Sequence, residues 1–374
     1  MVYPYYLHNN EEFVNYWKEY FNNNPINDDT RIEIYVDFPF CRSICKFCVF
    51  GSYTLHQYID QINLYEEAVV NLVNDMKDAF PERVNNIYFG GGTPTLWNKK
   101  KLIELTKSIP IYDEIKLKTF EVHPFDISDE MIDFITNDLN IKTVSFGVQS
   151  FDETSNKEQR RIPGNIEMMK KAIEKFHEHN MFVNIDIVAL FNDDNEHGWE
   201  VFLNDLDIAS SVLKPDGICS SVNFKCKNYY GKSIYYRKLL KDFLDHHSEY
   251  VIAKPESLSL NIDNVIAFEE EPYYLRTPEY HQFHTSCNVG IIDRNFEIAK
   301  NNVIIAFGGN GIHNAISRAG ANMEEISSRF DFEKQRFIHQ VNKVKVPDKT
   351  KKVQKIRIGT QLIDQEYDLT YNGK

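Results

Sequence analysis

Short apolar runs alternate with amphipathic stretches between residues 31 and 223. The apolar runs are rich in β-branched residues, as buried strands are. The predicted strands are Ile32–Asp37, Asn86–Phe89, Lys116–Val122, Thr143–Val148, Phe182–Val188 and Gly217–Asn223. The helical periodicity between them predicts helices over Tyr58–Asp78, Lys99–Ser108, Asp129–Asn137, Ile166–Asn180 and His197–Leu213. Six strand-then-helix units predict an α/β fold with a parallel sheet, whose active site would lie at the carboxyl ends of the strands.

The flanking segments follow a different pattern. Residues 1–30 predict an N-terminal extension with a helix over Glu11–Phe21 that ends in an Asn-rich breaker. We assign residues 31–228 to the barrel-like core and residues 229–374 to a family-specific region on the substrate side. Within that region Ser233–Phe243 resembles a helix, and Val303–Gly311 predicts a buried strand that enters a glycine turn. The Lys-rich run from 343 to 355 predicts a solvated surface.

Composition narrows the function classes. The chain has 374 residues, 42% of them hydrophobic, and a formal net charge of −13. A protein that binds duplex nucleic acid must neutralise the negative charge of the phosphates, so a chain this acidic is a poor general binder of it. No apolar run is long enough to span a bilayer, and no basic, apolar leader opens the sequence. These features predict a cytoplasmic protein whose partner is a small-molecule substrate.

Three cysteines, Cys41, Cys45 and Cys48, follow the first predicted strand with three and two residues between them. This spacing lets three thiolates hold three irons of a [4Fe–4S] cluster and leave the fourth iron open for chemistry. A disulfide would leave one cysteine over, and a zinc site would need a fourth ligand, for which His56 is distant. Zinc binding and plain buried thiols stay as the alternatives.

The remaining cysteines, Cys219, Cys226 and Cys287, are scattered along the chain. We interpret them as structural or substrate-facing thiols, with a second cluster as the alternative.

The cysteine pattern, with the aromatic Phe47 before its last cysteine, resembles the radical S-adenosylmethionine (SAM) superfamily. Two further motifs, Tyr35-x-x-x-Pro39-Phe40 and Gly90-Gly-Gly-Thr-Pro94, resemble the branch of the oxygen-independent coproporphyrinogen III oxidase (HemN/HemW-like). The resemblance implies a partial (β/α)6 TIM-like barrel with a shortened α+β C-terminal region. It also implies a [4Fe–4S] cluster on the three cysteines, one or two SAM molecules, and Phe47 packed beside the cluster.

The resemblance further implies a set of SAM contacts at successive strand ends. Gly91, Gly92 and Thr93 would bind the amino group of SAM, since glycines let a ligand approach the backbone closely. Glu121 would be a SAM-contacting acid, although it could instead cap the turn that follows it. The other implied residues are Gln149, Arg161 for the SAM carboxylate, Asp186 for the ribose or the substrate, and Tyr35 beside a second SAM.

Several positions depart from the family pattern. Asp37 stands where porphyrin-acting relatives have His, and the segment from His284 to Cys287 differs from their His-Asn-x-x-Tyr-Trp. The turn Ala189–Asp193 replaces a Gly-Leu-Pro-Gly-Gln turn, and His123 has no assigned role. The changes at Asp37 and after His284 lie on the substrate side, so we expect retained SAM chemistry on a changed substrate, and the altered turn at Ala189–Asp193 changes the contacts expected with the cofactor edge or the substrate.

The main hypothesis is therefore a radical SAM enzyme that cleaves SAM reductively and then oxidises a small molecule or transfers a methyl or methylene group to it. Its catalytic residues would be Tyr35 and Asp186, and its reductant a carrier such as flavodoxin or ferredoxin. The alternatives are a haem chaperone that binds haem or another tetrapyrrole, a coproporphyrinogen III oxidase proper, and a non-enzymatic iron–sulfur protein.

Overall fold

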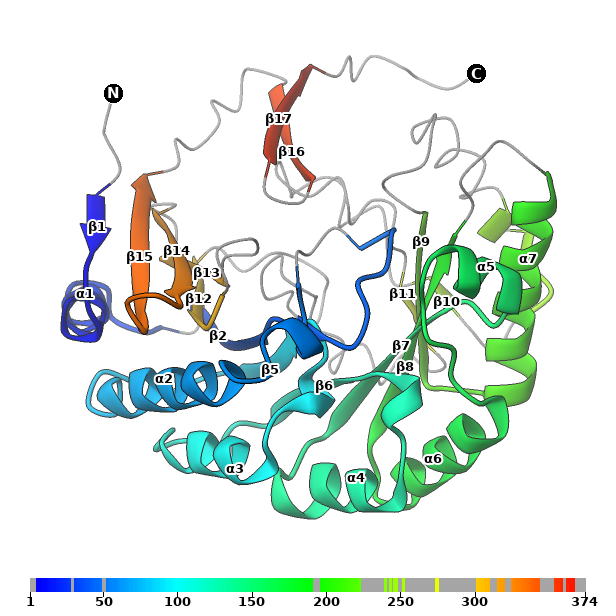
Figure 1. Cartoon of the computed structure of the whole chain (residues 1–374), viewed down its shortest axis with the longest axis horizontal. Coiled ribbons are helices and arrows are strands. Elements are labelled where there is room, and N and C mark those ends of the chain that lie inside the picture. The colour runs from blue at the N-terminus through cyan, green and yellow to red at the C-terminus, as the bar shows by residue number, and fades with distance from the viewer. Residues whose placement is uncertain are drawn as a thin grey trace.

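The structure is a computed structural model of the chain (Figure 1). It describes residues 5–27, 30–48, 52–190, 196–222, 301–309, 315–319, 324–343, 353–358 and 361–366, with short pieces between 239 and 275. Several sequence-based expectations lie outside these residues, wholly or for the most part: the turn residues 191–193, Cys226, Cys287, the segment after His284, the helix expected over Ser233–Phe243 and the Lys-rich run from 343 to 355.

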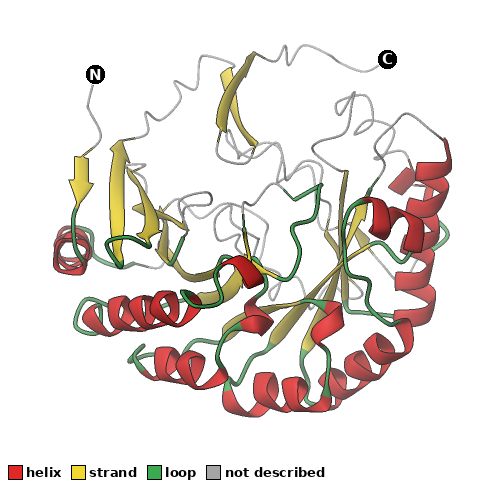
Figure 2. Cartoon of the chain, in the orientation of Figure 1, coloured by secondary structure: helices red, strands yellow, loops and turns green. Residues whose placement is uncertain are grey.

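A curved parallel sheet forms the centre of the fold (Figures 1 and 2). Its neighbouring strands run in the order β12-β2-β5-β6-β7-β8-β9, and every neighbouring pair is parallel. The strands are β2 (Thr30–Phe38), β5 (Asn86–Gly91), β6 (Leu117–Val122), β7 (Thr143–Gln149), β8 (Phe182–Ala189), β9 (Gly217–Val222) and β12 (Asn301–Phe307). Their carboxyl ends therefore gather at one edge of the sheet.

The helices cover the convex side of this sheet (Figure 2). They are α2 (Ile62–Asp75), α3 (Lys99–Lys107), α4 (Asp129–Asp133), α6 (Ile166–Glu178) and α7 (Glu196–Asp207), whereas the short α5 (Glu153–Glu158) follows the carboxyl end of β7. Side-chain caps begin three of these helices: the Asn98 side chain accepts from two backbone N–H groups of α3, Ser128 accepts from one in α4, and Asn165 accepts from one in α6. Buried apolar residues on one stripe of α2, α3, α4, α6 and α7 pack on the sheet.

Two other kinds of helical segment complete the connections. Short 3₁₀ turns lie at η1 (Leu55–Gln57), η2 (Pro94–Leu96) and η3 (Pro124–Asp126). The π-helical segments η4 (Phe134–Asp138) and η5 (Ile208–Leu213) continue α4 and α7. The single predicted helix over Asp129–Asn137 is therefore one α-helical turn followed by a wider one.

Antiparallel strands extend the sheet at both edges. Beyond β12 come β13 (Ala315–Ala319), β14 (Glu324–Asp331), β15 (Arg336–Lys343) and β1 (Tyr5–Leu7). Beyond β9 come β11 (Tyr273–Leu275) and β10 (Val251–Ile252), while β16 (Val353–Ile358) and β17 (Gln361–Glu366) form a separate hairpin. Within the described residues, thirteen strands thus belong to one sheet.

The N-terminal segment packs against the late strands of the chain. Helix α1 (Asn10–Asn23) confirms the predicted helix over Glu11–Phe21, and its Phe13 and Trp17 are fully buried. The Phe13 ring stacks on His339 of β15, with ring centres 4.4 Å apart, and meets Phe307 of β12 edge-on at 6.4 Å. Burial of these rings holds α1 against β12 and β15.

The α/β class and all six predicted strands are confirmed. Helix α5 was not predicted, because its six residues are all polar, and the short strands at both edges of the sheet were not predicted either. The strand expected at Val303–Gly311 joins the central parallel sheet as β12 beside β2. The central sheet thus has seven parallel strands rather than six.

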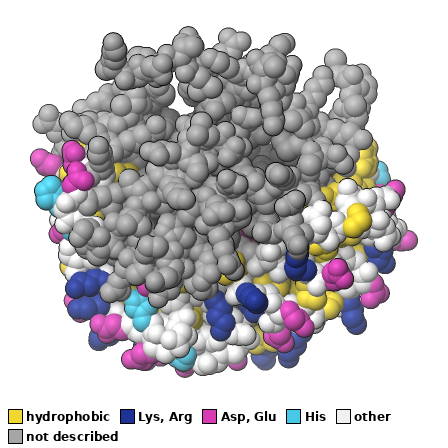
Figure 3. All heavy atoms as spheres, turned by 180° about the vertical axis from the view of Figure 1, so that it is seen from behind, with side chains coloured by type: hydrophobic (Ala, Val, Ile, Leu, Met, Phe, Trp, Pro, Cys, Tyr) yellow, Lys and Arg dark blue, Asp and Glu magenta, His cyan; other side chains and the backbone are white. Residues whose placement is uncertain are grey.

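On the face shown in Figure 3, the described Lys and Arg side chains alternate with Asp and Glu. No helix among the described residues is long and apolar enough to cross a membrane.

Candidate functional site

The cysteine loop leaves β2 at the carboxyl edge of the sheet. Its start is held by a two-residue pairing of β3 (Phe40–Cys41) with β4 (Tyr53–Thr54). Further along, the Lys46 backbone N–H donates to Gln159 O at 2.9 Å, and Ser43 Oγ donates to the Arg160 carbonyl at 3.0 Å. The loop is thus fixed both to its own strand and to the turn that follows α5.

Aromatic rings pack against the outer side of this loop. Phe332, from the β14–β15 hairpin, lies 5.6 Å from the Tyr53 ring and 5.3 Å from the Tyr58 ring, and these two tyrosines stack at 4.2 Å. Phe40, one residue before Cys41, packs on the Tyr65 ring at 5.3 Å. These contacts keep the cysteine loop closed against α2 and the late hairpin.

The glycine turn at the end of β5 faces Cys41 directly. Thr93 Oγ1 donates to Cys41 Sγ at 3.3 Å, and the Gly92 N–H donates to Phe38 O at 2.7 Å. A Cβ at Gly92 would lie 2.7 Å from Phe40 O and 3.0 Å from Cys41 Sγ, so a side chain cannot fit there. Glycine at 92 therefore leaves open the space beside the first cysteine.

These residues fit an iron–sulfur cluster by donor chemistry. Cys41, Cys45 and Cys48 lie within one loop and form no disulfide, and Cys41 and Cys45 are close enough to interact electrostatically. Within the part of the chain that the structure describes, no three His, Cys, Asp or Glu side chains converge as the ligands of one metal ion would. A cubane gives each cysteine its own iron, so its ligands surround the cluster without meeting at one point.

Glu121, near the end of β6, lies beside the glycine turn. Tyr88 Oη donates to its Oε1 at 2.7 Å, and Tyr35 stacks on the Tyr88 ring with centres 5.9 Å apart. Burial raises the pKa of Glu121 to about 7, which the Tyr88 hydrogen bond partly counters. Glu121 does not cap the following turn. His123 does so, because its Nδ1 accepts the Phe125 N–H at 3.2 Å.

Arg161 reaches from the turn after α5 into the strand ends. Its guanidinium donates to the Gly147 carbonyl and lies 3.8 Å from Cys45 Sγ, whereas the neighbouring Arg160 is exposed. A Cβ at Gly147 would stand 3.3 Å from this guanidinium and 3.2 Å from the Gln149 amide. Gln149 has a φ of 73° at an irregularity in the β7–β8 pairing, which turns its side chain out of the strand alternation.

Asp186, on β8, belongs to a small polar network inside the sheet. Its carboxylate accepts from Asn184 Nδ2 at 2.8 Å and from Ser145 Oγ at 3.1 Å. Burial raises its pKa to about 6, and these bonds together with Arg161 act in the opposite direction. Sequence reasoning missed Asn184, Ser145 and Tyr88. The available signal was their polarity at inward positions of strands that are otherwise apolar.

Asp37 is the largest addition to the predicted site. It is fully buried at the end of β2, and its Oδ2 accepts the Gly309 N–H at 3.1 Å across 272 residues of sequence. A Cβ on Gly91, whose φ is +110°, would stand 2.4 Å from the other carboxyl oxygen. Tyr65 Oη donates to the Asp37 carbonyl at 2.8 Å. The Asp37 side chain thus lies between the glycine turns of β5 and β12.

Together the predicted residues surround one carboxyl-rich space. The structure brings Cys41, Cys45, Gly91, Gly92, Thr93, Glu121, Gln149, Arg161 and Asp186 to the same edge of the sheet, with Tyr35 beside Tyr88. Phe47 and Cys48 are half-buried in the same loop. Burial raises the pKa of three acids here, Asp37, Glu121 and Asp186, and the latter two interact with Arg161. Such a site is suited to a cationic ligand, which would stabilise the ionised acids.

Comparison with known proteins agrees with this arrangement. Residues 35–206 match the family described as the Radical SAM superfamily, and the chain belongs to this superfamily through that domain. Members of the superfamily bind a [4Fe–4S] cluster and SAM. Within the superfamily, the relatives that the chain resembles are named for the HemN/HemW-like branch.

The relatives of that branch carry more than one activity in their names. An oxygen-independent coproporphyrinogen-III oxidase-like protein HemZ of Bacillus subtilis is 22% identical over 65% of this chain and 48% of its own length. An oxygen-independent coproporphyrinogen III oxidase of Helicobacter pylori is 27% identical over 45% of this chain and 38% of its own. A heme chaperone HemW of Buchnera aphidicola is 28% identical over 42% of each chain. The matched part thus spans half or less of each relative.

A solved structure supports the fold. The coproporphyrinogen III oxidase HemN of Escherichia coli superposes with a TM-score of 0.62 at 17% identity, over 89% of this chain and 75% of that one. The likeness therefore extends beyond residues 35–206.

Proposed function

We propose that the chain is an enzyme that cleaves SAM reductively at a [4Fe–4S] cluster on Cys41, Cys45 and Cys48, and starts radical chemistry on a small-molecule substrate. One observation carries this proposal: the cysteine loop packs directly on the glycine turn and on Arg161. Thr93 and Arg161 contact the sulfurs of Cys41 and Cys45, so a ligand of the open iron would contact residues of β5, β6 and β7 at once.

When bound, a reduced cluster supplies one electron to the sulfonium of SAM, whose C–S bond breaks to give methionine and a 5′-deoxyadenosyl radical that takes hydrogen from the substrate. The protein residues bind and orient. Arg161 can pair with the SAM carboxylate, and the backbone beside Gly91 and Gly92 can receive the amino group. Glu121, with a pKa of about 7, gains charge as the cation binds.

Asp186 suits a polar, uncharged group of the ligand. Its carboxylate already accepts two hydrogen bonds and has lone pairs left for a ribose hydroxyl. Tyr35 and Tyr88 form an aromatic wall on the β2–β5 side, beside which a second SAM or the substrate would stack. We assign to Tyr35 and Tyr88 the selection of the molecule, substrate or second SAM, that reacts with the radical.

The test is anaerobic reconstitution with iron and sulfide, followed by incubation with SAM and dithionite. Formation of 5′-deoxyadenosine, measured by mass spectrometry and lost in a Cys45→Ala variant, supports the proposal. Additional S-adenosylhomocysteine would assign methyl transfer. A fully loaded cluster that forms neither product would contradict the enzyme function.

The second candidate is haem handling, favoured by the names of the HemW relatives. A chaperone of this kind would bind haem without turning SAM over, whereas a coproporphyrinogen III oxidase would consume both SAM and porphyrinogen. Anaerobic haem titration separates the chaperone from the main proposal: a stoichiometric Soret shift without 5′-deoxyadenosine supports the chaperone.

A further inference from the structure

Helix α7 holds the turn that follows β7 through one buried carboxylate. Asp205 of α7 is 1% exposed; its Oδ2 accepts the Ser150 hydroxyl at 2.5 Å, and its Oδ1 accepts the Phe151 N–H at 2.8 Å. Burial raises the pKa of Asp205 to about 6, and both bonds act in the opposite direction. A buried carboxylate is costly unless it is bonded, so the turn is tied to α7 at this point.

The same turn is bonded to the backbone of Arg161. Asn156 of α5 is also buried; its Nδ2 donates to Ser150 O at 2.8 Å, and its carbonyl accepts the Arg161 N–H at 2.8 Å. The Arg161 guanidinium returns to β7, where it donates to Gly147 O. Ser150 and Asn156 thus connect Asp205 to Arg161, which is held by both its backbone and its side chain.

The far end of this segment holds the cysteine loop. Gln159 O accepts the Lys46 N–H at 2.9 Å, and the Arg160 carbonyl accepts the Ser43 hydroxyl at 3.0 Å. At the near end Gln149, with its φ of 73°, directly precedes the turn that α7 holds. The segment from Gln149 to Arg160 is therefore fixed to α7 at its start and to the cysteine loop at its end.

We infer that Asp205 is a positioning residue for SAM, because through Ser150 and Asn156 it fixes Gln149 and Arg161 where a ligand of the open iron would bind. The inference rests on the proposed function, in which Arg161 pairs with the SAM carboxylate. The Asp205 carboxylate bonds the turn, so it acts through these two side chains rather than on SAM itself. Outer partners that orient the ligands of a metal site typically contribute roughly 10- to 100-fold to affinity or activity.

A second buried acid provides a matched control. Asp216 is 4% exposed; its Oδ2 accepts the Val183 N–H at 2.9 Å and lies 2.8 Å from His177 Nε2. It stands directly before β9 and beside the start of β8, at the opposite edge of the sheet from Arg161. Loss of either carboxylate should destabilise the fold, but only Asp205 is bonded to the turn that holds Arg161.

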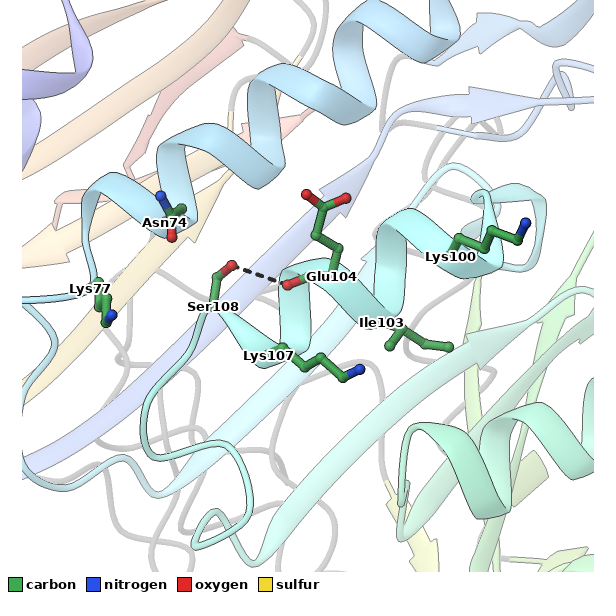
Figure 4. A pocket seen from close by; sticks show the side chains of 7 residues that line it. All are labelled: Asn74, Lys77, Lys100, Ile103, Glu104, Lys107 and Ser108. Carbon is green, nitrogen blue, oxygen red and sulfur yellow. Dashed lines mark hydrogen bonds between the residues drawn. The ribbon is translucent and has the colours of Figure 1, made fainter.

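A surface acid controls for the change in net charge. Glu104 of α3 is exposed beside a groove of about 350 Å³ that lies between α2 and α3 (Figure 4). Its carboxylate pairs with Lys101 at 3.3 Å. Glu104→Ala removes one negative charge, as Asp205→Ala does, and leaves the segment that holds Arg161 intact.

The test measures SAM affinity by calorimetry on protein with a reconstituted cluster, and the free energy of unfolding by urea denaturation of the cluster-free chain. We expect Asp205→Ala to bind SAM about tenfold more weakly than the wild type. Asp205→Asn should restore the affinity, because its amide oxygen can accept the Phe151 N–H and its amide nitrogen can donate to Ser150 Oγ. Asp216→Ala should lose stability but keep the wild-type SAM affinity, and Glu104→Ala should change neither.

Wild-type SAM affinity in Asp205→Ala overturns the inference, and so does a loss of affinity that is as large in Asp216→Ala. If Asp205→Ala does not fold, Ser150→Ala takes its place: it removes one of the two bonds, and wild-type affinity in this variant also overturns the inference.

A wild-type protein that carries its cluster but binds no SAM contradicts the proposed function instead. Hydrogen exchange of the cluster-free chain, followed by mass spectrometry, then decides on Asp205. Faster exchange across residues 147–161 in Asp205→Ala than in Asp216→Ala supports the positioning role, and equal exchange in the two variants overturns it.

Discussion

Replacement of Asp37 by Asn should stabilise the protein at neutral pH. Burial raises the pKa of the Asp37 carboxyl from 3.8 to about 8, and the charge of Glu121 acts in the same direction. The folded state therefore retains a proton that the unfolded chain releases above pH 4. The stability that this carboxyl contributes is complete below pH 4 and is lost progressively until pH 8.

The magnitude follows from the pKa difference. Each pH unit between about 4 and 8 costs the wild type about 1.4 kcal/mol relative to a neutral side chain. At pH 7 the pH lies about three units above the pKa of Asp37 in the unfolded chain, so Asp37→Asn should raise the free energy of unfolding by about 4 kcal/mol. The Asn amide oxygen can still accept the Gly309 N–H, so the contact between β2 and β12 is preserved.

The assay is urea denaturation of the cluster-free chain, followed by circular dichroism at pH 5, 6, 7 and 8. The difference in the free energy of unfolding between Asp37→Asn and the wild type should increase with each step in pH. Acids that do not interact with Asp37 titrate in both proteins and cancel in the difference, whereas repulsion between Asp37 and Glu121 exists only in the wild type and widens the difference further where both are ionised. An Asp138→Asn variant, at an exposed position, should follow the wild type throughout. A constant gap between pH 5 and 8 would refute the reasoning, because it would mean that Asp37 ionises normally in the folded state.

Three further changes test the site. Gly92→Ala should abolish cluster loading, measured as iron and sulfide content, because its Cβ would stand 3.0 Å from Cys41 Sγ and closer still to the Phe40 carbonyl. Arg161→Lys should weaken SAM binding in calorimetry about tenfold with the cluster retained, since an ammonium cannot reproduce a guanidinium fork that also serves a backbone carbonyl; unchanged affinity would remove Arg161 from the carboxylate site. Tyr88→Phe removes a bond that lowers the pKa of Glu121, so the pH midpoint of SAM affinity should move upward from about 7, and a midpoint equal to the wild type's would exclude Glu121 as the titrating group.

The cysteine loop and the strand ends could be predicted from the sequence because each is a local pattern. A strand followed at once by a glycine turn or a charged residue is visible in a few adjacent letters, and parallel strands bring such ends together. The choice of Arg161 over Arg160 could be based on spacing alone. In the structure Arg161 faces Cys45 and Arg160 faces solvent.

The contacts that were missed join distant parts of the chain. The pairing of β12 with β2 and the bond from Gly309 to Asp37 depend on where a late strand inserts, which local periodicity does not encode. His123 had no assigned role because its function is a side-chain bond to the backbone two residues later. The splitting of the helix after Asp129 depends on one widened turn.

The position of β12 also sets the order of events during synthesis. Strand β2, which leads into the cysteine loop, has β12 as one of its two neighbours, and β12 begins only at Asn301. At roughly 5–20 residues per second, β2 remains an open edge for roughly 15 to 50 s after it leaves the ribosome. Exposed strand edges recruit other chains. The strand nearest the cysteines is therefore among the last to be enclosed, and a nascent chain that stalls before β12 presents it for aggregation.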